Sequence, residues 1–151
     1  MLMVKIAAMN ADFLDDCTQL YVNVFSAQPW KESWSYDSGC QRLLDLIHTP
    51  NFLGYMLLDH NQLIGFIAGY SKMNYRGKTF YLAGFCVTTQ IQGKGYGSHL
   101  LYHLEQKLIE KGITSLFLIT EKMGSISSFY RKKGYSISEN RMVMRKELGL
   151  K

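Results

Sequence analysis

The stretch QGKGYG, residues 92–97, connects an apolar segment to an amphipathic segment that begins near Ser98. Three glycines at alternate positions, Gly93, Gly95 and Gly97, allow the backbone to point several N–H groups toward one place, because no Cβ blocks the turn. A helix that starts directly after the loop adds its unpaired amides and the positive end of its dipole. The stretch therefore predicts a cradle for a phosphate or pyrophosphate group.

The spacing of the glycines separates this loop from two other phosphate-binding motifs. A dinucleotide-binding fingerprint needs a further glycine where Ser98 stands, and a P-loop needs a Gly-Lys-Ser/Thr sequence, which is absent. A glycine-rich turn between a strand and a helix can also be only a tight connection. The loop by itself leaves that alternative open.

Hydrophobic periodicity predicts the elements on both sides of the loop. Helices are expected over residues 12–25, with Asn10 as the cap, from Asp37 or Ser38 to Thr49-Pro50, and over 98–111 and 125–133. Strands are expected over residues 3–8, 52–58, 62–71, 78–87, 114–120, 135–138 and 141–146. The early strands form an antiparallel meander, and the strand–helix–strand passage around the loop predicts a parallel crossover. The fold class is therefore α/β with a mixed sheet.

Length and composition indicate one globular domain over residues 1–151, with 47% apolar and 19% charged residues. Three cysteines, Cys17, Cys40 and Cys86, lie far apart without zinc-ligand spacing, so we expect reduced thiols and no metal site. No signal sequence or membrane-spanning run can be drawn at the N-terminus, which favours a cytoplasmic location. The net charge of +5 fits either a solvated surface or a polyanionic ligand.

Two segments, FCVTTQIQGKGYGSHLL at residues 85–101 and FYRKKGY at residues 129–135, together resemble the GCN5-related N-acetyltransferase (GNAT) superfamily. The first is similar to its signature segment, which has a Gln/Arg-x-x-Gly-x-Gly core. Residues 129–135, FYRKKGY, are similar to its second segment, Phe-Tyr-x-x-x-Gly-Phe, at the usual separation. The resemblance implies a GNAT-type acyl-CoA N-acyltransferase fold, with an antiparallel N-terminal meander and a parallel β-α-β crossover at the CoA site.

The same resemblance implies acetyl-CoA as cosubstrate and assigns roles to residues of both segments. The backbone of Phe85, Cys86 and Val87 would pair with the pantetheine arm. The pyrophosphate would be held by the amides of Gln92, Gly93, Lys94, Gly95, Tyr96, Gly97 and Ser98. Tyr130 would donate a proton to the leaving thiolate, a role that suits a phenol. Without the first segment, Tyr130 is more simply interpreted as a helix aromatic in the core.

The chain departs from the superfamily pattern at two places. Many members carry a Glu on the strand before the loop, as base or water-holder, whereas residues 81–85 here are Tyr-Leu-Ala-Gly-Phe and Gly84 stands where an acidic residue is expected. The frequent Asn before the last helix is also missing, since residues 121–125 read Glu-Lys-Met-Gly-Ser. The base must come from elsewhere, or water may serve.

The segment between the first two helices usually borders the acceptor pocket in this superfamily. Here it contains Trp30, Glu32 and Trp34, and two indole faces with one carboxylate could hold an ammonium by cation–π contact and ion pairing. The two tryptophans could equally pack the helices onto the sheet. Asp37, Tyr55 and Tyr81 are further acceptor candidates.

The leading functional interpretation is an N-acetyltransferase that moves acetyl from acetyl-CoA to a primary amine by direct attack in a ternary complex. The acceptor is a small molecule, such as an aminoglycoside, polyamine or amino sugar, or a peptide amine. An alternative is a non-catalytic acyl-CoA-binding module or sensor. No nucleic-acid-binding motif is present, so neither nucleic acid nor a membrane is expected as a partner, and a homodimer is possible.

Overall fold

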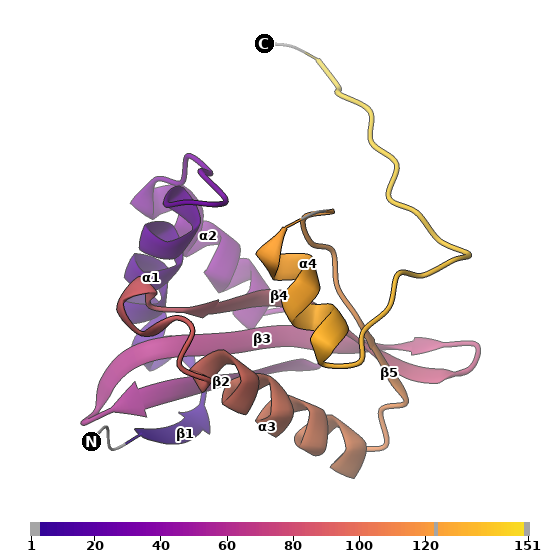
Figure 1. The fold of residues 1–151 in the computed structure, drawn as a ribbon, viewed down its shortest axis with the longest axis horizontal. Helices are drawn as coiled ribbons and strands as arrows, with labels where there is room; N and C mark the ends of the chain where they lie inside the picture. The colour runs from indigo at the N-terminus through magenta and orange to yellow at the C-terminus, as the bar shows by residue number, and fades with distance from the viewer. Residues whose placement is uncertain (1–3, 123, 150–151) are drawn as a thin grey trace. The chain divides into compact units, whose positions relative to one another are not determined.

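The computed structural model describes residues 4–122 and 124–149. The described residues form two compact units, one within residues 1–118 and one within residues 119–151. The first unit holds a five-stranded sheet with the order β1-β2-β3-β4-β5 (Figure 1). Its strands are β1 Val4–Ala8, β2 Phe52–Asp59, β3 Gln62–Asn74, β4 Gly77–Val87 and β5 Ser115–Phe117.

The sheet is mixed, as the sequence predicts. The strands β1 to β4 pair antiparallel with their neighbours, and β4 pairs parallel with β5 across the intervening helix α3. The helical segments of the first unit are η1 Ala11–Phe13, α1 Leu14–Ser26, α2 Tyr36–Ile47, η2 Thr89–Ile91 and α3 Tyr96–Glu110. The fold class is thereby confirmed, as an α/β arrangement with an antiparallel meander and a parallel crossover.

The two faces of the sheet carry different helices (Figure 1). On one face, alternate residues of β2 and β3 such as Met56, Phe66 and Ala68 form a core with buried residues of α1 and α2. The residues between them, including Leu57 and Ile67, are fully buried but face the other way. That second face is covered by α3, which contacts β2, β3 and β4. Its buried residues are Leu100, Leu101, Leu104 and Leu108.

Local side-chain chemistry explains where the first helices begin. The Asn10 side chain accepts a hydrogen bond from the Asp12 N–H at 2.9 Å and so caps the 3-10 helix η1. The α-helix α1 follows at Leu14, two residues later than expected, and has no side-chain cap of its own. The second helix starts one to two residues earlier than expected, because Ser35 and not Asp37 or Ser38 is the N-cap. Ser38 occupies the N3 position and returns a hydrogen bond to the Ser35 N–H, which completes a capping box.

The second unit contains α4, Ser125–Lys132, which ends before Gly134 in a left-handed conformation. The prediction of two strands over residues 135–138 and 141–146 is wrong, since residues 133–149 form neither helix nor strand. Both segments contain apolar residues, and Ile137 and Met144 are 70% and 84% exposed. Apolar residues alone do not make a strand, because a strand forms only where another strand accepts its hydrogen bonds.

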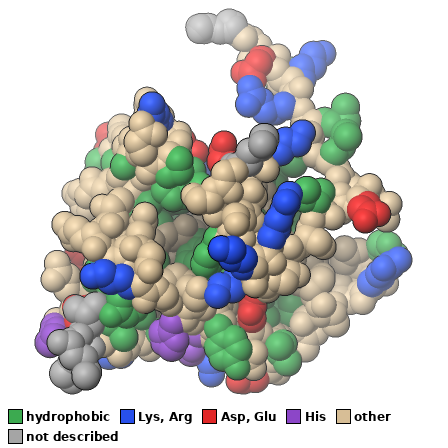
Figure 2. Space-filling model, viewed as in Figure 1, with side chains coloured by type: hydrophobic (Ala, Val, Ile, Leu, Met, Phe, Trp, Pro, Cys, Tyr) green, Lys and Arg blue, Asp and Glu red, His purple; other side chains and the backbone are tan. Residues whose placement is uncertain are grey.

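Basic side chains occur at several separate places on the face drawn in Figure 2, as the scattered Lys and Arg of the sequence suggest. Within residues 4–122 and 124–149, no helix has the length and apolar character needed to cross a membrane. The three cysteines are free thiols, and burial raises the pKa of the Cys17 thiol to about 12.

Candidate active site

The glycine-rich loop lies between β4 and α3 and is anchored to the sheet at its start. The Thr88 N–H donates to the Ile64 carbonyl at 2.8 Å, directly after the last residue of β4. The Gln92 side chain turns back and donates from Nε2 to the Val87 carbonyl at 2.8 Å. Gln92 therefore braces the loop with its side chain, and only its backbone N–H is left to serve the pyrophosphate cradle expected from the sequence.

Two glycines of the loop adopt backbone conformations that side chains disfavour. Gly93 has φ +85° and Gly95 has φ +87°, and Gly95 is the N-cap of α3 in the left-handed region. A Cβ placed on either glycine would meet no atom within 4 Å, so the space above the loop is open. The two glycines are therefore required by the course of the backbone and not by crowding.

The start of α3 presents unpaired donors toward that open space. No side chain caps the helix, and Tyr96, Gly97 and Ser98 are its first three residues, whose N–H groups have no partner within the helix. The helix begins one or two residues earlier than expected, which brings the Tyr96 amide into the same set. Together with the helix dipole and the exposed Lys94, these amides form a site suited to an anion.

The strand that leads into the loop separates from β5 before it reaches the loop. The ladder between β4 and β5 joins Thr79–Tyr81 to residues 115–117, and among the described residues it does not continue along β4 to Val87. A bulge in the pairing with β3 occurs at Ala83, which stands between the partners of Gly69 and Ala68. The segment of Phe85, Cys86 and Val87 thus follows a bulge and lies beyond the parallel ladder, as a strand that receives an extended ligand must.

The Cys86 side chain has a structural place in this segment. It is 5% exposed and belongs to the core beneath α1 and α2, and burial raises the pKa of its thiol. Any contact of Cys86 with a coenzyme would therefore be made by its backbone.

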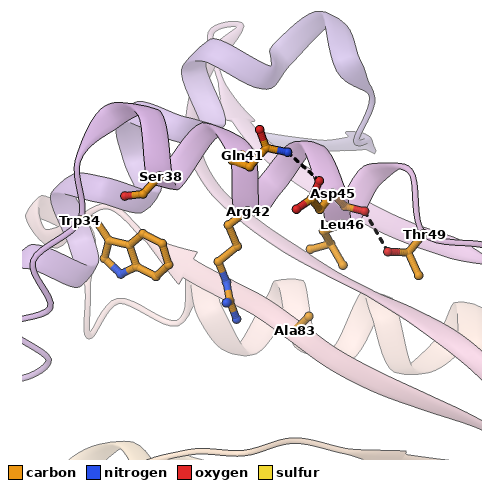
Figure 3. A pocket seen from close by; sticks show the side chains of 8 residues that line it. All are labelled: Trp34, Ser38, Gln41, Arg42, Asp45, Leu46, Thr49 and Ala83. Atoms are coloured by element: carbon orange, nitrogen blue, oxygen red, sulfur yellow. Dashed lines mark hydrogen bonds between the residues drawn. The ribbon is translucent and has the colours of Figure 1, made fainter. Parts of the chain in front are cut away.

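A second concave site lies between α2 and β4 in the first unit. Figure 3 shows this cavity of about 510 Å³, with Arg42 and Trp34 reaching from α2 and its preceding loop toward β4. The lining residues are Trp34, Ser38, Gln41, Arg42, Asp45, Leu46, Thr49 and Ala83. Because Ala83 is the bulged residue of β4, the cavity adjoins the same strand that leads to the glycine loop.

The structure separates the acceptor candidates that the sequence groups together. Trp34 lines the cavity, and its Nε1 donates to the Glu32 carboxylate at 2.7 Å. Trp30 instead packs edge-on against Phe25, with 4.9 Å between ring centroids. Tyr81 is not among the lining residues and lies between the rings of Tyr70 and Phe117, at 5.7 and 5.0 Å.

Polar residues of α2 and of the turn after it are the part of the cavity that the sequence interpretation missed. Ser38, the adjacent pair Gln41 and Arg42, Asp45 and Thr49 follow one another at steps of three or four residues, the spacing of one helical face. That polar stripe was visible in the sequence. It carries no information about what it faces, because a stripe of this kind is ordinarily the solvated side of a surface helix.

Tyr130 lies in the second unit, on α4. Its ring contacts those of Phe129 and Tyr135, with centroids 5.3 and 5.6 Å apart, and burial raises the pKa of its phenol. A raised pKa keeps the phenol protonated at neutral pH, which a proton donor needs. Its role opposite the coenzyme sulfur stays a prediction.

Comparison with known proteins identifies the family. The model of the acetyltransferase (GNAT) family matches residues 12–135, which include both the glycine loop and the segment around Tyr130. The chain belongs to the GNAT acetyltransferase family. No curated protein sequence matches the chain significantly.

Solved structures of GNAT-like acetyltransferases share the fold of this GNAT chain at low sequence identity. An aminoglycoside acetyltransferase from an uncultured soil metagenomic sample is 23% identical, with TM-score 0.72 over 98% of this chain and 97% of that one. A possible acetyltransferase from Clostridium difficile reaches TM-score 0.83 at 12% identity, over 97% and 99% of the two chains. An aminoglycoside N-acetyltransferase solved with CoA is 16% identical, with TM-score 0.76 over 98% and 97%.

We expect Gly95→Ala in this GNAT protein to weaken acetyl-CoA binding about 10-fold. An L-residue costs about 1–2 kcal/mol in the left-handed conformation, so the loop would turn away from it and carry the first amides of α3 with it. Gly112→Ala is a matched control, because Gly112 has φ +78°, also has no atom within 4 Å of an added Cβ, and follows the other end of α3. Calorimetric titration of both variants checks this, and equal loss of affinity in the two would contradict it.

Proposed function

We propose that this GNAT protein is an N-acetyltransferase that transfers acetyl from acetyl-CoA to a primary amine by direct attack in a ternary complex. The observation that carries the proposal is the loop in which left-handed Gly93 and Gly95 lead into the uncapped start of α3. Such a loop fits a pyrophosphate, because backbone donors converge on open space with no Cβ in the way. Acetyl-CoA would supply the thioester as acetyl donor.

The chain's own residues would hold two parts of the coenzyme, the pyrophosphate and the pantetheine arm. Amides from Gln92 to Ser98, with the cation of Lys94 nearby, would bind the pyrophosphate. The backbone of Phe85 to Val87, beyond the end of the ladder with β5, would pair with the pantetheine arm in the manner of an added strand. In this arrangement the thioester would lie along β4 on the side of Ala83, the bulged residue that also lines the cavity.

Tyr130 would complete the transfer as a general acid. The amine nitrogen forms a bond to the thioester carbonyl carbon, the C–S bond breaks, and the phenol O–H gives its proton to the departing thiolate. The nitrogen of the new amide loses one proton to water and the phenolate regains one from water, so amine and thioester yield amide and thiol. Holding amine and thioester in one complex makes the attack effectively unimolecular, which supplies part of the rate enhancement.

The attacking amine must first lose a proton, and β4 offers no carboxylate for that step. Residues 77–87 contain neither Asp nor Glu, and the Gly84 position faces Phe66. Among the residues that line the cavity, Asp45 is the carboxylate, and its Oδ1 accepts from Gln41 Nε2 at 2.7 Å. We propose that the proton leaves through cavity water, with Asp45 as the group that can receive it.

The acceptor would be a small molecule or a peptide that presents a primary amine to the cavity beside Trp34. Two neighbours of similar fold are named as aminoglycoside acetyltransferases, so aminoglycosides belong in the first panel of acceptors. Polyamines, amino sugars, amino acids and lysine peptides complete that panel.

The test is the release of free CoA from acetyl-CoA with each amine, followed by a thiol reagent between about pH 6 and pH 9. We expect amine-dependent thiol release and a product heavier by one acetyl group. Tight acetyl-CoA binding with no amine-dependent release for any compound would refute the enzyme and favour a non-catalytic acyl-CoA-binding module.

A further inference from the structure

The cavity beside β4 carries a guanidinium at its centre. Arg42 projects from α2 toward β4, and Trp34 and Ala83 lie on either side of its end in Figure 3. Its Cζ lies 5.6 Å from the centroid of the Trp34 ring, a cation–π contact that orients the side chain. Arg42 thus occupies the place beside the indole that the sequence suggests for the ammonium of an acceptor.

The carboxylates near Arg42 are engaged by other groups. Glu32 accepts a hydrogen bond from the indole N–H of Trp34, and Asp45 accepts one from Gln41. Among the described residues, the salt bridges lie elsewhere and Arg42 takes part in none of them. The guanidinium therefore enters the cavity as a positive charge with no carboxylate of residues 4–122 or 124–149 at ion-pair distance.

The guanidinium of Arg42 also acts on the pKa of the buried phenol of Tyr21. Burial raises the pKa of Tyr21 to about 12, and the nearby Arg42 opposes that rise, while Glu32 adds to it. Arg42 consequently lies close to the phenol of Tyr21, on α1, as well as lining the cavity.

From this arrangement we infer that the acceptor carries an anionic group, a carboxylate or a phosphate, that Arg42 binds next to the reactive amine. The inference rests on the proposed acetyl transfer and names its substrate class. A planar guanidinium pairs with carboxylate or phosphate oxygens through two parallel hydrogen bonds, and it repels a polycation. The cavity is thus better suited to an amino acid or an amino sugar phosphate than to an aminoglycoside.

Matched acceptor pairs test this inference. The members of each pair differ in one anionic group: an amino acid against its carboxamide, and an amino sugar against its 6-phosphate. We expect kcat/KM to favour the anionic member by about 10-fold or more, the size of a charge-assisted hydrogen bond. The preferred pair distinguishes a carboxylate from a phosphate as the natural group.

Variants of the cation assign the preference to its residue. Arg42→Gln should remove the preference by raising KM for the anionic member about 10- to 100-fold, with little change for the neutral member. Arg42→Lys should keep part of the preference, since an ammonium has the same charge but lacks the two parallel N–H donors of a guanidinium. Arg76→Gln is the matched control. It removes the same charge, from an exposed residue in the turn between β3 and β4.

Calorimetry of the same compounds with the CoA-loaded protein separates this inference from the proposed function. Turnover of cationic and anionic acceptors alike, unchanged by Arg42→Gln, would overturn the anion site and leave acetyl transfer standing. Arg42-dependent binding of the anionic compounds without any thiol release would support the anion site and refute acetyl transfer. If neither turnover nor binding occurred, both would be refuted.

Discussion

Tyr130→Phe lowers kcat about 100-fold or more and leaves the acetyl-CoA dissociation constant within about threefold, if Tyr130 protonates the leaving thiolate. The substitution removes only the hydroxyl, so the ring contacts with Phe129 and Tyr135 remain. A proton donor acts in the transition state, and its loss therefore appears in kcat and not in ground-state binding. Steady-state kinetics with the best acceptor, together with calorimetry for acetyl-CoA, measure the two effects.

Tyr102→Phe provides the control, because Tyr102 is 61% exposed on α3 and loses the same hydroxyl. A kcat for Tyr130→Phe within about threefold of that control would remove Tyr130 from the mechanism and leave it as a packing residue.

The dependence of kcat on pH is a second test of the role of Tyr130. A general acid is active only while protonated, so activity would fall as pH rises through its pKa. Burial raises the pKa of Tyr130 above its ordinary value of about 10, which moves that fall to higher pH. We expect no alkaline loss of kcat up to about pH 9. An alkaline limb below that pH that disappears in Tyr130→Phe would contradict the buried phenol.

Gly69→Ala should destabilise the first unit by about 3 kcal/mol or more. A Cβ at Gly69 would stand 2.0 Å from the Tyr81 carbonyl oxygen and 2.7 Å from the Phe80 ring. Backbone cannot move aside as a flexible side chain can, so β3 and β4 would have to part beside the bulge at Ala83. Urea denaturation gives the change in the free energy of unfolding, provided that the m-value is unchanged.

The control for Gly69 is in the facing strand. A Cβ at Gly84 would meet only the Phe66 ring at 3.4 Å, which is ordinary contact, so Gly84→Ala should change the free energy of unfolding by less than about 1 kcal/mol. A similar loss in both variants would show that glycine at these positions serves something other than the close approach of the two strands.

The sequence alone predicted the parts of this protein that depend on near neighbours in the chain. The Asn10 cap, the β3–β4 pairing around residues 75–76 and the glycine loop were predictable, since φ preferences and capping hydrogen bonds act over a few residues. The start of α2 was misplaced by local competition, because Ser35 and Ser38 are both good caps and only the hydrogen bonds distinguish them.

Only the tertiary structure decided the features that depend on distant partners. It placed Arg42 beside Trp34 and across from Ala83, and it ended the parallel ladder at Tyr81. It also left residues 135–146 without strands despite their apolar residues. The charge inside the cavity, the pairing of the strands and the shape of the pocket arise where segments far apart in sequence meet. The glycine loop could be predicted from the sequence because its backbone conformation is set within six consecutive residues, 92–97.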